Sequence, residues 1–308
     1  MRRLFLFSLI LVLLLDACSA AALPAGDLNP PSPSAVNSAI PQLTAPGSSA
    51  TPTSLPTALP TVLSEVPTLV ITASPVVPAA TPTRQGPGKI LCPILLYHHI
   101  ATPKQDNPYY VTPAEFREQM QALKDWGYTA ISINLLVKAI NFGAVLPARP
   151  VVITFDDGDV SVYEQAFPVM REFGFRGVTY LVVNYVGAAG YMSVEQLKEL
   201  AAANWEMGSH SMTHSDLTAS TRVEWEVVQS RHSLEKLLGV AVMTFAYPYG
   251  KKDVDIQRLV RENYRAGLGL GNYLEQGPNN IFYLWRRPVL TGWDVKTFGS
   301  FLPWNAPP

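Results

Sequence analysis

Short apolar runs alternate with longer amphipathic segments from residue 89 onward. The runs are rich in β-branched residues, as buried strands are, and the longer segments repeat apolar residues with helical spacing. We expect strands at residues 90–97, 128–132, 151–155, 177–183, 205–210, 242–247 and 264–270. We expect helices at residues 112–125, 135–141, 161–173, 193–203, 222–238 and 253–263, with a short helix after Trp293.

Two of the expected helices carry clear start signals. Residues 112–115, Thr-Pro-Ala-Glu, combine a capping box with proline at the first helical position. Residues 193–196, Ser-Val-Glu-Gln, form a second capping box.

The alternation of strands and helices predicts an α/β fold with a parallel sheet. About seven repeats within about 215 residues favour a distorted (β/α) barrel over an open doubly wound sheet. His98, Asp156, His210 and Tyr249 each follow the end of an expected strand. Barrel enzymes build their active sites at the face where the strands end, so we expect these residues to lie together.

The first 18 residues resemble an export signal. Two arginines precede an apolar core at residues 4–15, which is too short to span a membrane comfortably. The segment ends in Leu-Asp-Ala-Cys, which resembles a bacterial lipobox and predicts a lipid on Cys18. Ordinary signal-peptidase cleavage near residues 20–22 and an uncleaved anchor are the alternatives. We expect an exported lipoprotein on the outer side of the cytoplasmic membrane or in the cell envelope.

Residues 19–88 are dominated by Pro, Ala, Thr and Ser, and hold 14 of the chain's 27 prolines. Proline removes backbone donors, and the segment has no sustained apolar period, so it cannot build a core. We expect a disordered, semi-extended tether here, followed by one folded domain at residues 89–308.

The net charge argues against a nucleic-acid partner, and the number of cysteines argues against a disulfide bond. A formal net charge of -1 argues against a nucleic-acid partner, which would call for a basic face. The chain has two cysteines. If Cys18 carries lipid, Cys92 has no disulfide partner and is most simply a small buried side chain.

Two polar motifs follow expected strands. Asp156 and Asp157 precede a glycine at the end of one strand, and His210 and His214 stand four residues apart after another. One carboxylate and two imidazoles make a three-ligand site for a divalent ion that keeps a position open for water. The other carboxylate is then free to act as a general base. Either motif alone would be weak evidence, since Asp-Asp-Gly is common in turns, but together they indicate a hydrolase.

The first motif, Thr-Phe-Asp-Asp-Gly, and the second, His-Ser-Met-Thr-His, resemble those of the polysaccharide deacetylases of the NodB-homology type, carbohydrate esterase family 4. The resemblance covers residues 90–303. It implies that Asp156 is the catalytic base, and that Asp157, His210 and His214 are the metal ligands.

The third motif and the acid histidine depart from the usual family pattern. Ala-Tyr-Pro-Tyr-Gly lines up with the third motif and implies that the backbone of Tyr249 helps to hold the oxyanion, but Ala246 stands where the family usually has arginine. The C-terminal Leu-x-His motif is missing, because no histidine follows His232. Leu-Leu-Tyr-His-His-Ile resembles the N-terminal motif of the poly-N-acetylglucosamine deacetylase branch and implies that His98 is the general acid. His99 is the second candidate, and a structural role for His98 at the strand end is the other alternative.

The resemblance to this branch also suggests a replacement for the missing arginine. Arg286 and Arg287 precede a late apolar segment, and we expect Arg287 to hold Asp156 by a paired hydrogen bond. A solvated pair of arginines is the alternative. Trp285 and Trp293 could line a sugar groove, but taken singly each is better interpreted as a core residue.

The expected reaction is metal-assisted hydrolysis of an N-acetyl group on a cell-wall or extracellular polysaccharide, which releases acetate. Zinc suits the ligands best, and cobalt or nickel would fit the same donors. Poly-N-acetylglucosamine and peptidoglycan are the favoured substrates, with xylan and chitin oligomers behind them. A non-catalytic glycan-binding lipoprotein on the same fold is the alternative, and a metal amidase for a small amide is a third hypothesis.

Overall fold

The computed structural model describes residues 81–103 and 107–308. The expected export signal, the lipidation site at Cys18 and most of the expected tether lie outside the described residues, so those expectations stay predictions.

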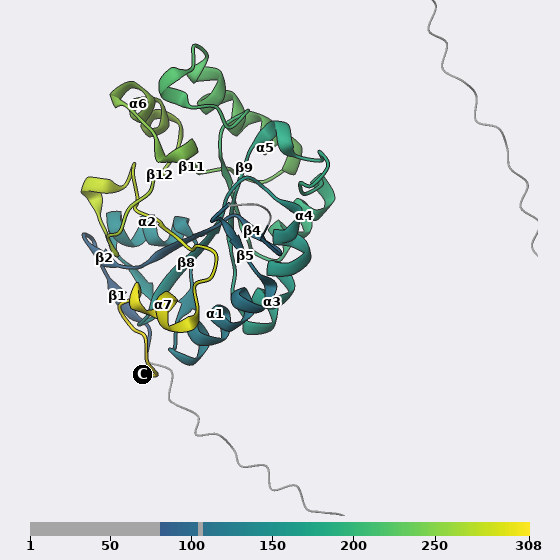
Figure 1. Ribbon diagram of the computed structural model, residues 1–308. Helices are drawn as coiled ribbons and strands as arrows, with labels where there is room; N and C mark the ends of the chain where they lie inside the picture. Colours follow the sequence, from purple (N-terminus) through teal and green to yellow (C-terminus); the bar gives the residue numbers. More distant parts are fainter. Residues whose placement is uncertain (1–80, 104–106) are drawn as a thin grey trace, which may run out of the picture. The chain divides into compact units, whose positions relative to one another are not determined.

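A parallel sheet forms the centre of the domain (Figure 1). Its strands follow one another in the order β12 (Ala266–Leu268), β11 (Thr244–Ala246), β10 (Glu206–Ser209), β9 (Val178–Leu181), β8 (Pro150–Phe155), β3 (Ile94–Tyr97) and β14 (Arg287–Pro288). A further strand, β6 (Thr129–Ala130), pairs with the start of β8. Every pair in this sheet is parallel. The α/β barrel prediction is therefore confirmed.

The barrel is incomplete between β12 and β14. In place of a full ladder, one parallel bridge joins Leu268 to Leu284. Two further backbone bonds, from Gly269 to the carbonyl of Leu284 and from Gly271 to the carbonyl of Arg286, continue the contact. Residues 281–286 thus close the sheet without forming a regular strand, which makes the barrel distorted, as expected.

All the helices of the described residues except α2 (Ile133–Phe142) pack against the outer face of the sheet (Figure 1). The helices are α1 (Pro113–Asp125), α2, α3 (Phe167–Phe173), α4 (Val194–Ala202), α5 (Ser230–Leu238), α6 (Val254–Asn263) and α7 (Val295–Ser300). Short 3-10 turns are η2 (Val183–Tyr185), η3 (Leu217–Ala219), η5 (Pro248–Gly250) and η6 (Pro278–Asn280). The π-helical turns η1 (Val162–Ala166) and η4 (Trp225–Gln229) precede α3 and α5, so the helices expected at residues 161–173 and 222–238 change hydrogen-bond pattern near their first turn.

The expected caps form in both cases. The Thr112 side chain accepts a hydrogen bond from the Glu115 amide, and Glu115 accepts one from the Thr112 amide in return. Ser193 and Gln196 make the same reciprocal pair at the start of α4. These bonds satisfy backbone donors that the first turn of a helix leaves free. The start of each helix could therefore be predicted from the local sequence.

Two apolar cores lie on opposite sides of the sheet. The outer core joins Phe155, Trp205 and other outward side chains to the surrounding helices. The inner core fills the barrel with Val152, Tyr180 and neighbouring side chains, and α2 contributes residues such as Leu136 to it. Because the inner core packs the barrel interior, polar chemistry is left to the face where the strands end.

The strand expected at residues 90–97 is divided into β2 (Ile90–Leu91) and β3, and the short strands β1 (Thr83–Gln85), β4 (His99–Ile100), β5 (Tyr110–Val111), β7 (Ala144–Leu146) and β13 (Glu275–Gln276) were not expected from the sequence. β1 pairs antiparallel with β7, so the folded domain includes residues that the sequence assigned to the tether. β2 pairs with β13, and β4 pairs with β5. Within the described residues, no helix combines the length and apolar character needed to cross a membrane.

Candidate active site

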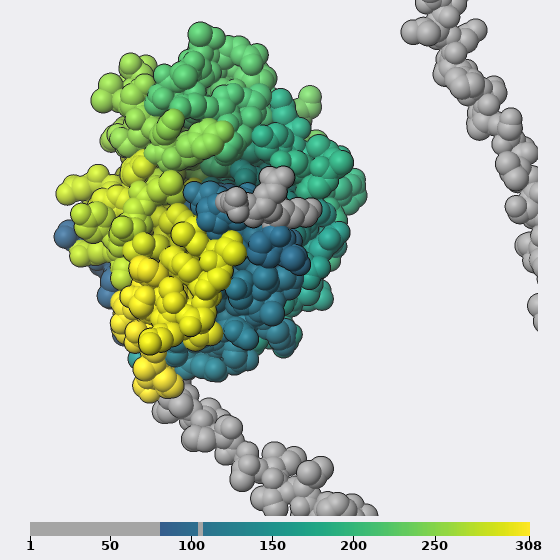
Figure 2. All heavy atoms as spheres, viewed as in Figure 1, coloured from purple at the N-terminus to yellow at the C-terminus, as the bar shows by residue number. Residues whose placement is uncertain are grey.

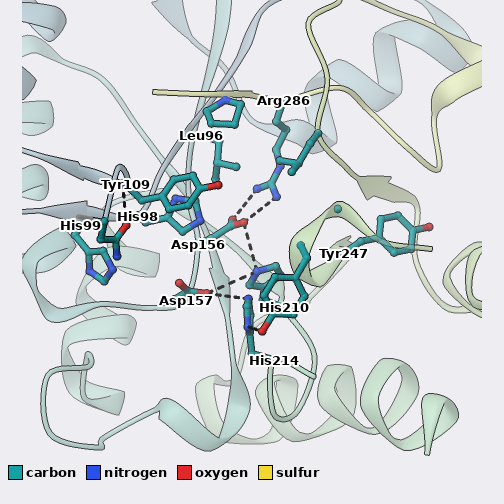
Figure 3. A pocket seen from close by; sticks show the side chains of 15 residues that line it. Leu96, His98, His99, Tyr109, Asp156, Asp157, His210, His214, Tyr247 and Arg286 are labelled. Atoms are coloured by element: carbon teal, nitrogen blue, oxygen red, sulfur yellow. Dashed lines mark hydrogen bonds and ion pairs between the residues drawn. The ribbon is translucent and has the colours of Figure 1, made fainter. Parts of the chain in front are cut away.

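The side chains that were expected to meet do lie around one cavity of about 220 Å³ at the ends of the strands (Figure 3). The cavity is lined by His98 after β3, Asp156 and Asp157 after β8, His210 and His214 after β10, Tyr249 in η5, and Arg286 just before β14. Elements far apart in the sequence therefore contribute to a single polar site.

Asp157, His210 and His214 form the part of the site that could hold a metal ion. One donor atom from each lies within 4.8 Å of the other two. The Asp157 Oδ1 is 3.4 Å from the Nε2 of His214 and 3.7 Å from the Nε2 of His210. Three converging donors of the carboxylate and imidazole type match a catalytic site that keeps a coordination position open.

The hydrogen bonds of both imidazoles favour this use. The Nδ1 of His210 donates to the carbonyl of Ala246 at 2.8 Å, so Nε2 is the nitrogen left to bind a metal ion. The Nδ1 of His214 lies 3.2 Å from the hydroxyl of Tyr249. Metal-binding histidines are oriented in this way by a partner on their second nitrogen. Burial, followed by the charge of His210, lowers the pKa of His214, which favours the neutral ligand form.

Two further observations fit a bound ion. The Asp157 Oδ1 is buried and has no hydrogen-bond partner in the part of the chain that the structure describes. In addition, Asp157, Ser211, His214 and Tyr249 all have positive φ. Such backbone conformations are costly for residues with a side chain and gather at functional sites. The donor set therefore fits a divalent ion of the zinc type.

Asp156 is held by an arginine. The Arg286 Nη1 and Nη2 donate to its two oxygens at 2.6 and 2.8 Å, and both side chains are almost fully buried (Figure 3). Burial alone would raise the pKa of Asp156, but the charges of Arg286 and His210 outweigh it and lower the pKa to about 2. Asp156 is thus an ionised carboxylate at neutral pH, beside the candidate metal ligands.

The expectation that Arg287 holds Asp156 is wrong, since Arg286 makes the paired hydrogen bond. Neighbouring residues on an extended segment point to opposite faces, and here Arg286 points into the barrel. Arg287 points outward, with its guanidinium 4.2 Å from the ring centre of Phe301. Arg286, just before β14, thus supplies the arginine that is absent at position 246.

The two histidines after β3 have different surroundings. His98 packs against Tyr109 at 4.6 Å between ring centres, and its Nδ1 is buried without a hydrogen-bond partner among the described residues. His99 Nδ1 lies 2.9 Å from an oxygen of Asp159, and its ring stacks on Tyr110. Burial is the main cause that lowers the pKa of His98, against the opposing effect of the two aspartates.

A buried glutamate that the sequence did not single out supports the histidine loop. Glu226 is 1% exposed and accepts hydrogen bonds from the amides of Met212 and Thr213, both at 3.0 Å, and from the Thr213 hydroxyl. These bonds fix the loop between His210 and His214. The carboxylate lies in the π-helical turn η4, and such turns often occur at functional sites.

The two tryptophans do not line this cavity. Trp293 stacks on Phe301 at 4.6 Å and packs against the outer core. Trp285 faces a different cavity. Cys92 is buried, as expected, and burial raises the pKa of its thiol.

Comparison with known proteins shows a similarity to polysaccharide deacetylases. Residues 144–266 match the family model for polysaccharide deacetylase. The poly-beta-1,6-N-acetyl-D-glucosamine N-deacetylase of Staphylococcus epidermidis is 27% identical over 176 residues, which cover 52% of this chain and 61% of that relative.

Solved structures show the same similarity. A polysaccharide deacetylase from Bacillus cereus has 27% identity and a TM-score of 0.63, with 69% of each chain covered. The structure of IcaB from Ammonifex degensii has 25% identity and a TM-score of 0.56, and covers 67% of this chain and 93% of that one. The described domain is thus similar to the polysaccharide deacetylases, among them the poly-N-acetylglucosamine deacetylase of Staphylococcus epidermidis.

Proposed function

We propose that this chain is a metal-dependent enzyme that removes N-acetyl groups from a polysaccharide outside the cell and releases acetate. The observation that carries the proposal is the ionised Asp156, fixed by Arg286 at the edge of the Asp157, His210 and His214 cluster. A carboxylate in this position is suited to accept a proton from an attacking water.

When held by the three ligands, a divalent ion, preferably zinc, supplies Lewis acidity toward the water and the acetyl carbonyl. Asp156 takes the proton from the attacking water, and the backbone amide of Tyr249 stabilises the oxyanion. The protonated His98 gives its proton to the sugar nitrogen as the C–N bond breaks. The products are acetate and a free amine on the polymer.

We assign the acid role to His98 in preference to His99. Both line the cavity, but the Nδ1 of His99 is already paired with Asp159. The His98 ring has no such partner among the described residues.

We infer that poly-N-acetylglucosamine is the preferred substrate, because a relative with that activity matches half of the chain. Peptidoglycan is the second candidate. The apolar start of the chain and the lipobox-like sequence at Cys18 support export and a lipid anchor.

The glycan-binding alternative loses its main support. It rested on Ala246, which stands where the family usually has arginine, and Arg286 supplies that charge from the segment before β14. A protein that only binds sugar has no need of a buried, oriented carboxylate beside a metal site.

The test is acetate release by the full-length chain from poly-N-acetylglucosamine and from peptidoglycan, with zinc, cobalt or nickel added after chelation. We expect release that depends on metal and is abolished by Asp156→Asn. Asp255→Asn, at a carboxylate whose side chain is 81% exposed on α6, is the matched control and should keep full activity. Absence of release from both polymers, with metal demonstrably bound, would refute the proposal.

A further inference from the structure

A second cavity, of about 680 Å³, lies on the outer side of the segment that carries Arg286. We call it the Tyr273 groove; its wall includes Lys89, Asn272, Tyr273, Glu275, Asn279 and Trp285. In Figure 2 the yellow-green residues of this region lie at the left edge of the face, beside dark blue residues from the start of the domain.

An aromatic pair forms one wall of the groove. Tyr273 is 67% exposed, and its ring centre lies 4.5 Å from that of Trp285 with the planes tilted by 44°. Gly271 makes room for the indole, since a Cβ at that position would lie 2.5 Å from Trp285 Cδ1. Large aromatic faces left in water mark binding surfaces, and they are suited to stack on the apolar face of a sugar ring.

The polar groups of the groove carry no net charge. Asn272 and Asn279 are exposed amides, which can donate and accept hydrogen bonds. The ammonium of Lys89 is paired with Glu275 at 3.1 Å, so the charges of these two side chains cancel. A neutral ligand rich in hydroxyl and amide groups fits this lining better than an anionic polymer does.

The groove and the active site share one pair of segments. Leu270 lines the catalytic cavity and Asn272 lines the groove. On the partner segment, Arg286 points into the catalytic cavity and Trp285 into the groove. The Gly271 amide donates to the carbonyl of Arg286 at 3.0 Å, so the two sites lie on opposite sides of the same backbone contact.

We propose that the Tyr273 groove is a second saccharide-binding site, which holds N-acetylated sugar units of the polymer away from the reacting unit. The identity of the polymer rests on the proposed function. The groove raises affinity for long chains, and Tyr273 does not touch the reacting atoms.

The test is calorimetric titration of the full-length Asp156→Asn protein, which cannot turn the polymer over, with a β-1,6-linked N-acetylglucosamine hexamer. Tyr273→Ala should raise the Kd roughly 5- to 10-fold, since an aromatic contact is worth about 1 kcal/mol. Tyr273→Phe keeps the ring and should bind within about 2-fold of the parent. Val254→Ala, at an exposed side chain on α6, is the surface control.

Binding and turnover separate the two proposals. If the wild-type chain releases no acetate while hexamer binding by the Asp156→Asn protein still depends on Tyr273, the groove proposal stands and the deacetylase proposal fails. If acetate is released but Tyr273→Ala binds the hexamer as tightly as the parent, the groove proposal fails alone. Two other results also overturn the groove proposal. One is that the Asp156→Asn protein does not bind the hexamer at all. The other is that Tyr273 is needed to bind a proline-rich peptide of residues 51–62 and not to bind the hexamer.

Discussion

Replacement of Arg286 by methionine tests the ion pair at the centre of the site. The guanidinium is 1% exposed and donates to both oxygens of Asp156 at 2.6 and 2.8 Å. Methionine keeps much of the volume but leaves Asp156 buried without a counter-charge. Removal of one partner from a buried pair costs about 3–5 kcal/mol. Because 1 kcal/mol shifts the melting temperature of a domain of this size by about 2–4 °C, we expect a fall of roughly 6–20 °C.

Arg287→Met is the matched control, because it removes the same group from the adjacent residue. Arg287 lies over the ring of Phe301, where a cation–π contact is worth about 0.5–1 kcal/mol. The melting temperature should therefore fall by only about 1–4 °C. Thermal unfolding followed by far-UV circular dichroism, with guanidinium titrations in parallel, measures both variants without reference to activity.

The double variant Arg286→Met with Asp156→Asn completes the design. It removes both charges, so no isolated carboxylate stays buried, and part of the lost stability should return. Equal melting temperatures for Arg286→Met and Arg287→Met would refute the argument. So would a double variant whose destabilisation is the sum of the two single losses.

Three further predictions address residues around the site and the barrel. Glu226→Ala should weaken metal binding about 10- to 100-fold in a chelator competition, and Glu226→Gln less so, because the carboxylate fixes the histidine loop; unchanged metal affinity would contradict this. Burial raises the pKa of Glu206 from its usual 4.5 to about 7. Between about pH 4.5 and 7, the folded state therefore keeps a proton on Glu206 that the unfolded state has lost. The free energy of unfolding then falls as the pH rises through this range, by at most about 3 kcal/mol. Glu206→Gln should remove this slope in denaturant titrations across pH 4.5–8, and a slope that persists would assign it to other groups. Gly208→Ala should cost about 1–3 kcal/mol in the same titrations, since its Cβ would lie 2.3 Å from the Tyr180 ring; wild-type stability would show that the ring moves away freely.

Local signals account for the parts of the fold that the sequence predicted. The capping boxes at Thr112 and Ser193 each satisfy backbone donors within one turn, so the helix starts could be located without any tertiary contact. The pairing of β1 with β7 could not be predicted from the sequence. It joins three-residue strands about 60 residues apart, and such short strands are stable only because the surrounding fold brings them together.

The candidate metal ligands could be predicted from the sequence, but the arginine that holds Asp156 could not. Asp157 lies two residues after β8 and His210 directly follows β10, and because the strands of a parallel barrel end at one face, the sequence alone predicts that these ligands lie together. Arg286 lies 130 residues from Asp156, and only the direction of its side chain distinguishes it from Arg287. The structure, and not the sequence, gives that direction. Val289 belongs to the outer core, and side chains alternate along an extended segment, so Arg287 shares the outward face and Arg286 must point into the barrel.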